Sequence, residues 1–168
     1  IDRLDVAQIE GRNVALVIDY KSSGAGAKFS WPEFHHGLDL QLPIYLLALR
    51  DTGTSWAETV AGAFCVPIAR TPDSASLREL GRNADRFGRK ANGLFNGEYA
   101  ESLDAKVDSG WSIFYNFCVT SKDGQYGRYP ISGALRPDEF GAVLEHTRNK
   151  IIALAGEIVA GRIDVHPY

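Results

Sequence analysis

An apolar, β-branched run that turns polar at its end is the feature that most constrains the fold of this chain. The run Val14–Tyr20 (VALVIDY) leads into Lys21 and then into a Gly/Ser-rich stretch. Such runs, bounded by turn residues, are typical of buried strands. Weak alternation over Leu4–Ile9 and the turn residues Glu10–Asn13 predict that this strand is the second of a β-hairpin.

The expected hairpin register brings acidic and basic side chains together. Either a two-residue loop at Gly11-Arg12 or a four-residue loop places Asp2 directly opposite Lys21 and diagonal to Asp19. Directly opposite residues share a face, with Cβ atoms about 5 Å apart, and residues two apart on a strand also share a face. Asp2, Asp19 and Lys21 are therefore predicted to cluster, whereas Asp5 should point to the other face.

Two carboxylates beside a lysine suit phosphate chemistry. Mg²⁺ binds through one or two carboxylates and keeps waters for a phosphate substrate. A bound metal polarises a phosphoryl oxygen and generates hydroxide near neutral pH, and a lysine ammonium can hold a phosphate or orient the attacking water. The alternative is a surface ion pair, which contributes at most about 1 kcal/mol. The D-x-K spacing alone does not decide between them.

A helix is expected from Pro32 to about Arg50, because apolar residues recur there at helical spacing. Pro43 lies inside it and is expected to kink it or to separate its first turns. Gln41 and Tyr45 are four residues apart and share one face. A glutamine is unusual on this apolar face. It either reaches back to the strand-end carboxylates, contacts a nucleic-acid backbone, or lies at the edge of the core.

The rest of the chain predicts an α/β or α+β domain with one central sheet. We expect a strand at Thr59–Ile68, a polar excursion over residues 70–110 with a short helix near Leu77–Arg89, a second hairpin turning at Lys122–Gln125, and a helix from Pro137 to about Ala160. The apolar stripe of that last helix consists of Phe140, Leu144, Thr147, Ile151, Leu154 and Ile158.

Composition narrows the function classes. The net charge is −3 and the pI is about 5.8, so the chain does not have the excess of Lys and Arg that many nucleic-acid-binding domains have. This disfavours tight non-specific DNA binding but allows a local basic groove. The most basic stretch (Arg70, Arg78, Arg82, Arg86, Arg89 and Lys90) either tracks a DNA backbone or forms a solvated helix face. Cys65 and Cys118 lie in apolar runs and are expected to be buried thiols. The sequence shows no signal-peptide or membrane-span pattern, which favours a soluble, intracellular protein.

Aromatic residues and histidines surround the start of the first helix. His35 and His36 are expected to face solvent rather than a metal. Trp31 and Phe34 either pack the preceding loop onto the sheet or stack on a nucleic-acid base.

Three motifs in combination, IDRLDV, VIDYKSS and GLDLQLPIYLLAL, resemble the nuclease domain of the AddB and RecB family. That family is the branch of the PD-(D/E)XK nucleases attached to bacterial recombination helicases. The motifs span residues 1–45 in the family's order and spacing, and the strand AGAFCVPI, the last helix and the ending VHPY resemble the AddB tail more loosely. The resemblance implies a restriction-endonuclease-like α/β core with a central mixed β-sheet flanked by helices.

The resemblance also implies residue roles. Two carboxylates and a backbone carbonyl would hold Mg²⁺ or Mn²⁺, a lysine would be catalytic, and a glutamine–tyrosine pair would position DNA or the metal ligands. In that order, these residues are Asp2 and Asp19, Tyr20, Lys21, and Gln41 with Tyr45.

The implied function is metal-dependent hydrolysis of DNA by an exonuclease domain that takes a single strand into its active site. Such a domain works with an AddA-like helicase/nuclease subunit in double-strand-break repair and recombination, in the bacterial cytoplasm at the nucleoid. One alternative is a catalytically inactive nuclease-fold module that binds single-stranded DNA or a partner subunit. Another is a stand-alone, CRISPR-associated RecB-like exonuclease.

Residues 1–168 are expected to be one nuclease domain within a longer helicase–nuclease subunit, truncated at both ends. In the family, an upstream helix supplies a further His or Glu ligand, and it would precede Ile1. AddB proteins often carry four cysteines for an iron–sulfur cluster, and Cys65 and Cys118 match none of their places. No cluster is therefore expected within these residues, although the full-length protein could carry one.

Overall fold

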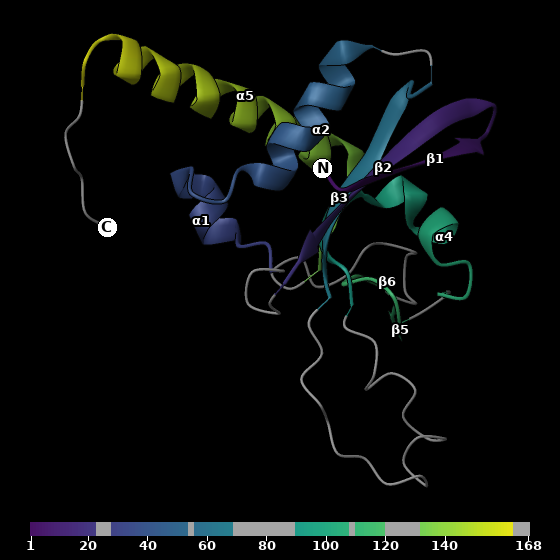
Figure 1. The fold of residues 1–168 in the computed structure, drawn as a ribbon. Helices are drawn as coiled ribbons and strands as arrows, with labels where there is room; N and C mark the ends of the chain where they lie inside the picture. The colour runs from purple at the N-terminus through teal and green to yellow at the C-terminus, as the bar shows by residue number, and fades with distance from the viewer. Residues whose placement is uncertain (23–27, 54–55, 69–89, 108–109, 120–131, 163–168) are drawn as a thin grey trace, which may run out of the picture.

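A five-stranded mixed sheet forms the centre of the molecule, in the order β1-β2-β3-β4-β7 (Figure 1). The computed structural model describes residues 1–22, 28–53, 56–68, 90–107, 110–119 and 132–162. The strands of the main sheet are β1 (Arg3–Ile9), β2 (Arg12–Lys21), β3 (Thr59–Pro67), β4 (Asn92–Asn96) and β7 (Ala134–Leu135). The β1/β2 and β3/β4 pairs are antiparallel, and the β2/β3 and β4/β7 pairs are parallel. The predicted α/β class with a central mixed sheet is confirmed.

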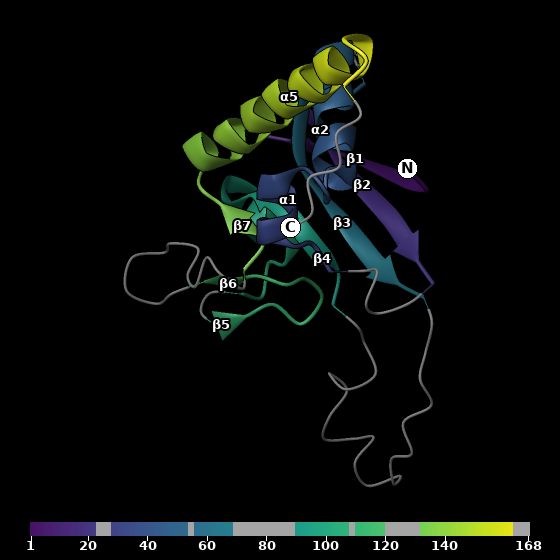
Figure 2. The same cartoon turned by 90° about the vertical axis from the view of Figure 1, so that its left-hand side faces the viewer.

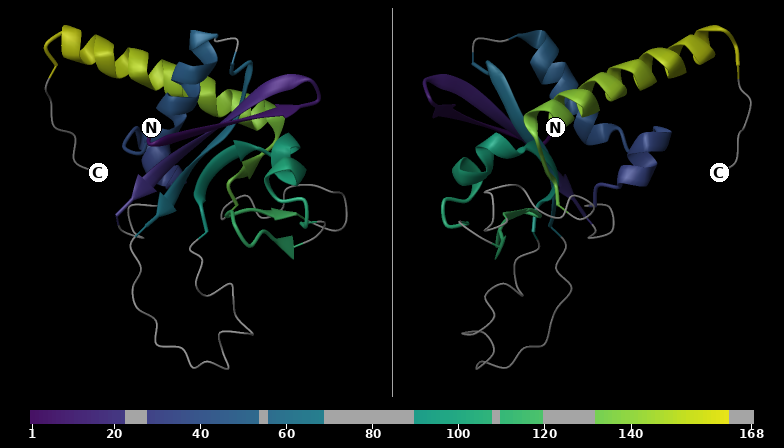
Figure 3. Two further views of the ribbon diagram at one scale, coloured as in Figure 1. Left: turned by 45° about the vertical axis from the view of Figure 1, so that its right-hand side comes forward. Right: turned by 180° about the vertical axis from the view of Figure 1, so that it is seen from behind.

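Helices and a small second sheet cover the two faces of the main sheet (Figures 1 and 3). The helices are α1 (Trp31–His36), α2 (Gln41–Thr52), α4 (Ala100–Leu103) and α5 (Pro137–Val159), with a 3₁₀ turn η2 (Gly97–Tyr99), and the small sheet pairs β5 (Gly110–Trp111) with β6 (Cys118–Val119). One core lies between the sheet and helices α2 and α5, and it contains Val17, Ala63 and Leu46. A second core on the other face contains Phe64, Phe95 and Phe117. Strand β3 contributes to both cores, which explains its continuous apolar sequence.

The hairpin of β1 and β2 has a register two residues away from the predicted one. Ile9 pairs with Arg12, so the turn is Glu10-Gly11 rather than Gly11-Arg12. Both turn residues have positive φ, 49° at Glu10 and 79° at Gly11, as a type I′ hairpin turn requires. The predicted register was wrong because the turn signal was placed one residue late. A shift of two residues leaves every side chain on its predicted face, since side chains alternate with period two.

The helix predicted from Pro32 to Arg50 is two helices, and Pro43 is not the cause of the break. Helix α1 ends at Gly37, which adopts the left-handed conformation with φ of 86°. Helix α2 begins at Gln41, so Pro43 lies in its first turn, where a missing N–H costs no helical hydrogen bond. The break places Gln41 at the very start of α2.

The prediction of an irregular excursion over residues 70–110 was wrong for its second half. Strand β4 lies there between β3 and β7, followed by η2 and α4. Strands β5 and β6 pair antiparallel just before the position of the predicted second hairpin. The short helix predicted near Leu77–Arg89, most of the basic stretch and the turn at Lys122–Gln125 lie outside the described residues.

Helix α5 packs against the core only as far as Ile151. Phe140, Leu144 and Thr147 are buried as predicted, but Leu154 is 41% exposed and Ile158 is 76% exposed. The helix therefore extends beyond the sheet, as Figure 2 shows. Two ion pairs tie its middle to the end of α2: Arg148 with Asp51 at 2.8 Å and Arg50 with Glu145 at 3.1 Å. Among the helices that the structure describes, none combines the length and apolar character needed to cross a membrane.

Candidate functional site

The carboxyl end of β2 carries an ion pair that is largely withdrawn from solvent. Asp19 is only 5% exposed, although it is charged. The Lys21 Nζ lies 2.6 Å from Asp19 Oδ2. Both side chains point to the α2 side of the sheet, because residues two apart on a strand share a face and Val17 packs into the core on that side. A buried carboxylate needs partners to compensate for lost hydration, and Lys21 is the first of them.

Asp2 reaches the same end of the hairpin from the neighbouring strand. Its Oδ2 accepts a hydrogen bond of 2.7 Å from the backbone N–H of Tyr20, and its own backbone N–H donates to the Ile18 carbonyl at 3.3 Å. Continuing the β1/β2 register past Arg3 and Ile18 places Asp2 opposite Asp19, not opposite Lys21 as predicted. The two carboxylates are thus cross-strand neighbours.

Helix α2 closes the site with Gln41 and Tyr45. Gln41 Oε1 accepts a hydrogen bond of 2.6 Å from Lys21 Nζ, and Gln41 Nε2 donates to the Tyr45 hydroxyl at 2.7 Å. Longer contacts of 3.5 Å run from Gln41 Nε2 to Asp19 Oδ2 and from the Tyr45 hydroxyl to Asp19 Oδ1. The glutamine that was unusual on an apolar helix face therefore reaches back to the strand end, the first of the expected alternatives.

Nearby charges and burial shift several pKa values around the site. The hydrogen bond to Asp19 raises the pKa of the Lys21 ammonium, against the opposing effect of burial. Burial raises the pKa of the Cys65 thiol to about 11. Burial also raises the pKa of Asp39, although a hydrogen bond from the Ser30 N–H and the charge of Lys21 act in the opposite direction.

Asp39 is a residue that the sequence analysis did not single out. Its carboxylate accepts a hydrogen bond of 2.9 Å from the Ser30 backbone N–H, and it interacts electrostatically with both Lys21 and Cys65. The sequence signal for it is weak: an aspartate two residues before Gln41 and two residues after the glycine that ends α1.

The donor set at the strand ends fits a hard divalent cation. Across the described ranges, no group of three or more His, Cys, Asp and Glu side chains is arranged to hold a metal ion. The donors that the motifs assign here, which are the carboxylates of Asp2 and Asp19 and the backbone carbonyl of Tyr20, are all oxygen atoms. Mg²⁺ needs only one or two carboxylates and completes its shell with water and phosphate oxygens. A soft-metal site is disfavoured, because Cys65 is a buried thiol with a raised pKa.

Most of the other residues weighed in the sequence lie away from this cluster, although strand pairing places Cys65 beside Asp19. Asp5 pairs with Leu16 and ion-pairs with Arg3 at 2.7 Å on the other face of the hairpin, as predicted. His35 and His36 are exposed, and His35 stacks on the ring of His146. Cys65 and Cys118 are free and buried, which confirms that prediction.

The geometry is matched by sequence similarity over the whole chain. Residues 1–168 match the PD-(D/E)XK nuclease superfamily from end to end. The chain belongs to this superfamily. The mixed sheet flanked by helices is consistent with the restriction-endonuclease-like fold implied by the motifs.

Several curated relatives of this PD-(D/E)XK domain are described alike, as a subunit of an ATP-dependent helicase/deoxyribonuclease. The protein from Streptococcus suis is 34% identical over 100% of this chain, that from Lactiplantibacillus plantarum is 30% identical over 99%, and that from Clostridium acetobutylicum is 27% identical over 100%. The chain spans between 13% and 15% of the length of these relatives. The similarity therefore concerns one region of much longer proteins.

Proposed function

We propose that residues 1–168 are a metal-dependent DNA exonuclease domain of an AddB-like helicase/nuclease subunit. The observation that carries this proposal is the network in which one lysine ammonium contacts both Asp19 Oδ2 and Gln41 Oε1 at 2.6 Å. A surface ion pair needs neither a buried carboxylate nor an amide aimed at the lysine. Family membership supports hydrolysis of a phosphodiester bond, and nucleases of this superfamily generally use divalent metal ions.

Asp2, Asp19 and the carbonyl of Tyr20 hold a divalent cation in this proposal, with Mg²⁺ as the physiological ion and Mn²⁺ as a substitute. The bound ion supplies Lewis acidity and lowers the pKa of a coordinated water. The hydrogen bond from the Tyr20 N–H to Asp2 Oδ2 fixes the orientation of that carboxylate. The proposed ligands are all oxygen atoms, as Mg²⁺ prefers, and waters or phosphate oxygens would complete the shell.

Lys21 acts as the phosphate-facing cation. An ammonium has three hydrogens, and the contacts to Asp19 and Gln41 occupy two of them. The third is available for a non-bridging phosphate oxygen or for the attacking water. Because Gln41 is held in turn by the Tyr45 hydroxyl, this pair limits the rotation of the lysine and positions its remaining hydrogen. The start of α2 at Gln41 adds the positive end of a helix dipole at the same place.

The substrate and partner follow from the relatives. Their description names a helicase and a deoxyribonuclease, so we propose DNA as the substrate, with a single strand in the site, and an AddA-like subunit as the partner. The role would be double-strand-break repair and recombination in the bacterial cytoplasm, at the nucleoid.

The test is a cleavage assay with the full natural chain, using linear single-stranded and double-stranded DNA with Mg²⁺ or Mn²⁺. Asp19→Asn and Lys21→Met are each expected to lower the cleavage rate by at least about a hundredfold, the effect of removing one electrostatic group from an active site. Chelation with EDTA should abolish cleavage reversibly. Matched controls are Asp138→Asn and Lys106→Met, which lie outside the site and should retain activity.

Full activity in both site variants would overturn the assignment of these residues. If the wild-type chain bound DNA without cutting it in either metal, the catalytically inactive binding module would replace the exonuclease as the better interpretation.

A further inference from the structure

A second feature lies along the same edge of the sheet as the carboxylates. Strand pairing aligns Asp19 on β2 with Cys65 on β3, and Cys65 with Asn92 on β4. Aligned residues on neighbouring strands share a face, and strands are spaced about 4.8 Å apart. Asn92 therefore lies two strands, or roughly 10 Å, from Asp19. Beside Asn92 is a cavity of about 300 Å³.

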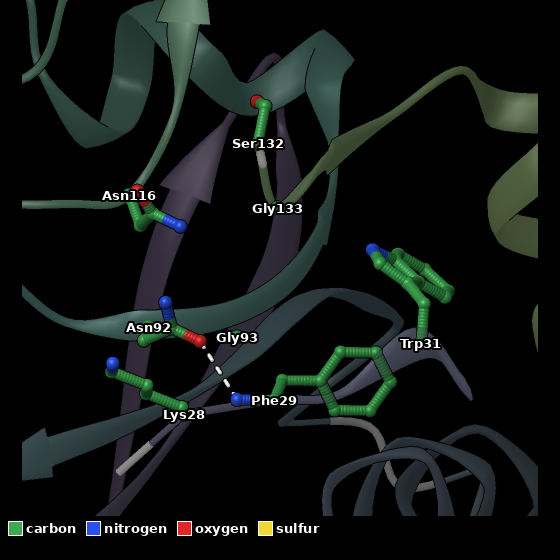
Figure 4. Close-up of a pocket in the computed structure, with 8 residues that line it drawn as sticks. All are labelled: Lys28, Phe29, Trp31, Asn92, Gly93, Asn116, Ser132 and Gly133. Carbon is green, nitrogen blue, oxygen red and sulfur yellow. Dashed lines mark hydrogen bonds between the residues drawn. The ribbon is translucent and has the colours of Figure 1, made fainter. Parts of the chain in front are cut away.

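The cavity combines two aromatic rings, several amide or hydroxyl groups and one cation. Phe29 and Trp31 lie on one side, and Asn92 and Asn116 lie on the other, with Ser132 also in the wall (Figure 4). Lys28, which directly precedes Phe29 in the chain, completes the lining of the cavity. None of the described residues that line the cavity carries a carboxylate. Its charge therefore favours an anionic ligand such as a nucleotide.

The polar groups of the cavity are fixed in orientation. The backbone N–H of Phe29 donates to Asn92 Oδ1 at 2.8 Å, which leaves the amide NH₂ of Asn92 directed to the opposite side, as Figure 4 shows. Ser132 is 2% exposed, and its Oγ accepts from the Ala134 N–H at 3.3 Å. Ser132 is thus a buried part of the wall. The cavity presents the amide NH₂ of Asn92 to whatever occupies it.

The aromatic wall is rigid as well. The rings of Phe29 and Trp31 meet edge to face with centroids 4.9 Å apart, and Trp31 also contacts Phe34 edge to face at 5.9 Å. Gly93 and Gly133 also line the cavity. Their backbones lie so close together that a Cβ on Gly133 would collide with the carbonyl oxygen of Gly93. This close backbone contact holds β4 against the segment that leads into β7. The cavity is therefore formed before any ligand arrives, which lowers the entropic cost of binding.

We propose that this cavity is a nucleobase subsite for single-stranded DNA, placed beside the phosphate site at Asp19 and Lys21. Its volume lies at the lower end of ligand pockets, which suits one base. Aromatic faces stack with any base, the amide NH₂ of Asn92 pairs with a base carbonyl or ring-nitrogen acceptor, and Lys28 contacts a phosphate. This inference rests on the proposed function, because it assumes that the scissile phosphate of the DNA strand lies at Asp19.

The distance sets which base enters the subsite. Stacked nucleotides repeat every 3.4 Å along a strand, so roughly 10 Å corresponds to about three stacked nucleotides, and to fewer when the strand is extended. The subsite should therefore bind a base within three nucleotides of the cleaved bond. It would bind the DNA strand without strong sequence preference, because stacking is tolerant of base identity.

The test measures binding of a fluorescent single-stranded oligonucleotide to the full natural chain by anisotropy, in EDTA so that no cleavage occurs. Trp31→Ala is expected to weaken binding by about 5- to 150-fold, the range that loss of one stacked base gives. Trp56→Ala is the matched control, because Trp56 is 47% exposed and precedes β3 at the other end of the sheet. Lys28→Ala should weaken binding at every base and reduce the slope of log affinity against log salt by about one.

Abasic substitutions separate base binding from effects on folding. Oligonucleotides with one abasic position, moved along the strand, should bind the wild type more weakly at one or two adjacent positions. In Trp31→Ala that position dependence should vanish, whereas in Trp31→Phe it should persist. Thermal unfolding of each variant checks that the fold is intact. Competition with a free deoxynucleoside monophosphate tests whether the cavity prefers a base within a DNA strand to a free nucleotide. We expect the free nucleotide to compete only weakly.

Two results would overturn the subsite: wild-type binding that is insensitive to every abasic position, or a free mononucleotide that competes as well as the oligonucleotide. Normal cleavage with no abasic sensitivity refutes the subsite and leaves the proposed nuclease. Abasic sensitivity in a chain that never cleaves supports the subsite and refutes the nuclease instead.

Discussion

The contact between Gln41 and Tyr45 yields the sharpest prediction about how the site works. Tyr45→Phe removes the hydroxyl that accepts from Gln41 Nε2 at 2.7 Å and keeps the ring that packs against the core. Gln41 is largely exposed, so its released amide can be hydrated, and the loss should be that of one neutral hydrogen bond, about 1 kcal/mol. Because the amide positions Lys21, kcat/KM for DNA should fall about 5-fold.

Gln41→Ala removes more, since it also deletes the acceptor 2.6 Å from the Lys21 ammonium. A hydrogen bond to a charged group contributes about 1.5–3 kcal/mol, so kcat/KM should fall by about 10- to 150-fold. If Tyr45 acts through Gln41, the double variant should behave like Gln41→Ala alone, with a coupling energy of about 1 kcal/mol.

The assay is degradation of linear single-stranded DNA by the full natural chain at saturating Mg²⁺, with kcat/KM determined for the wild type, both single variants and the double variant. Tyr99→Phe is the matched control, because Tyr99 lies in η2, away from the site. Strictly additive effects of the two substitutions would refute the chain of contacts from Tyr45 through Gln41 to Lys21. So would a Tyr45→Phe enzyme with wild-type activity.

Two further predictions concern the buried groups near the site. Burial raises the pKa of Asp39 in the folded state, so protonation of Asp39 stabilises the folded state. This contribution to the free energy of unfolding is fully present below the unfolded-state pKa and is lost as the pH rises through the folded-state pKa. Asp39→Asn, which can still accept from Ser30, should therefore be more stable than the wild type at pH 7. The advantage should disappear near pH 3 in urea titrations, and a gain that persists there would contradict the reasoning. Cys65 has a pKa raised to about 11 and Cys118 is buried, so iodoacetamide at pH 8 should label neither thiol until denaturant is added, as mass spectrometry would reveal. Rapid labelling of the native chain would show that the core is open.

The sequence predicts the site better than it predicts the elements around it. Contacts join Asp19, Lys21, Gln41 and Tyr45, and Asp2 lies at the same strand end, even though the hairpin register was two residues off. Their roles in catalysis stay predictions. The error was harmless because strand faces repeat every two residues. The turn itself could not be placed from residue type alone, since Glu10 rather than a second glycine takes up a positive φ.

Elements that depend on distant partners were not predictable in the same way. Strand β4 has a short sequence, NGLFN, and forms because β3 and β7 flank it. The exposed end of α5 kept the apolar spacing of a buried helix, so periodicity suggested packing that the described residues do not provide. Asp39 was missed because its burial depends on the fold around Ser30, not on a motif.

The two functions proposed for this sheet edge are assembled over different stretches of chain. The side-chain hydrogen bonds that join different elements of the carboxylate cluster link residues 18 to 26 positions apart. The cavity instead depends on a hydrogen bond between residues 63 positions apart and on β7, which comes later still. Closing a longer loop costs more conformational entropy, and segments held by few distant contacts open first in native proteins. Local opening at β7 would therefore disrupt the proposed nucleobase subsite, while Asp2, Asp19 and Lys21 stay together. Under the two proposals, DNA binding would be weakened before the carboxylate cluster is disturbed.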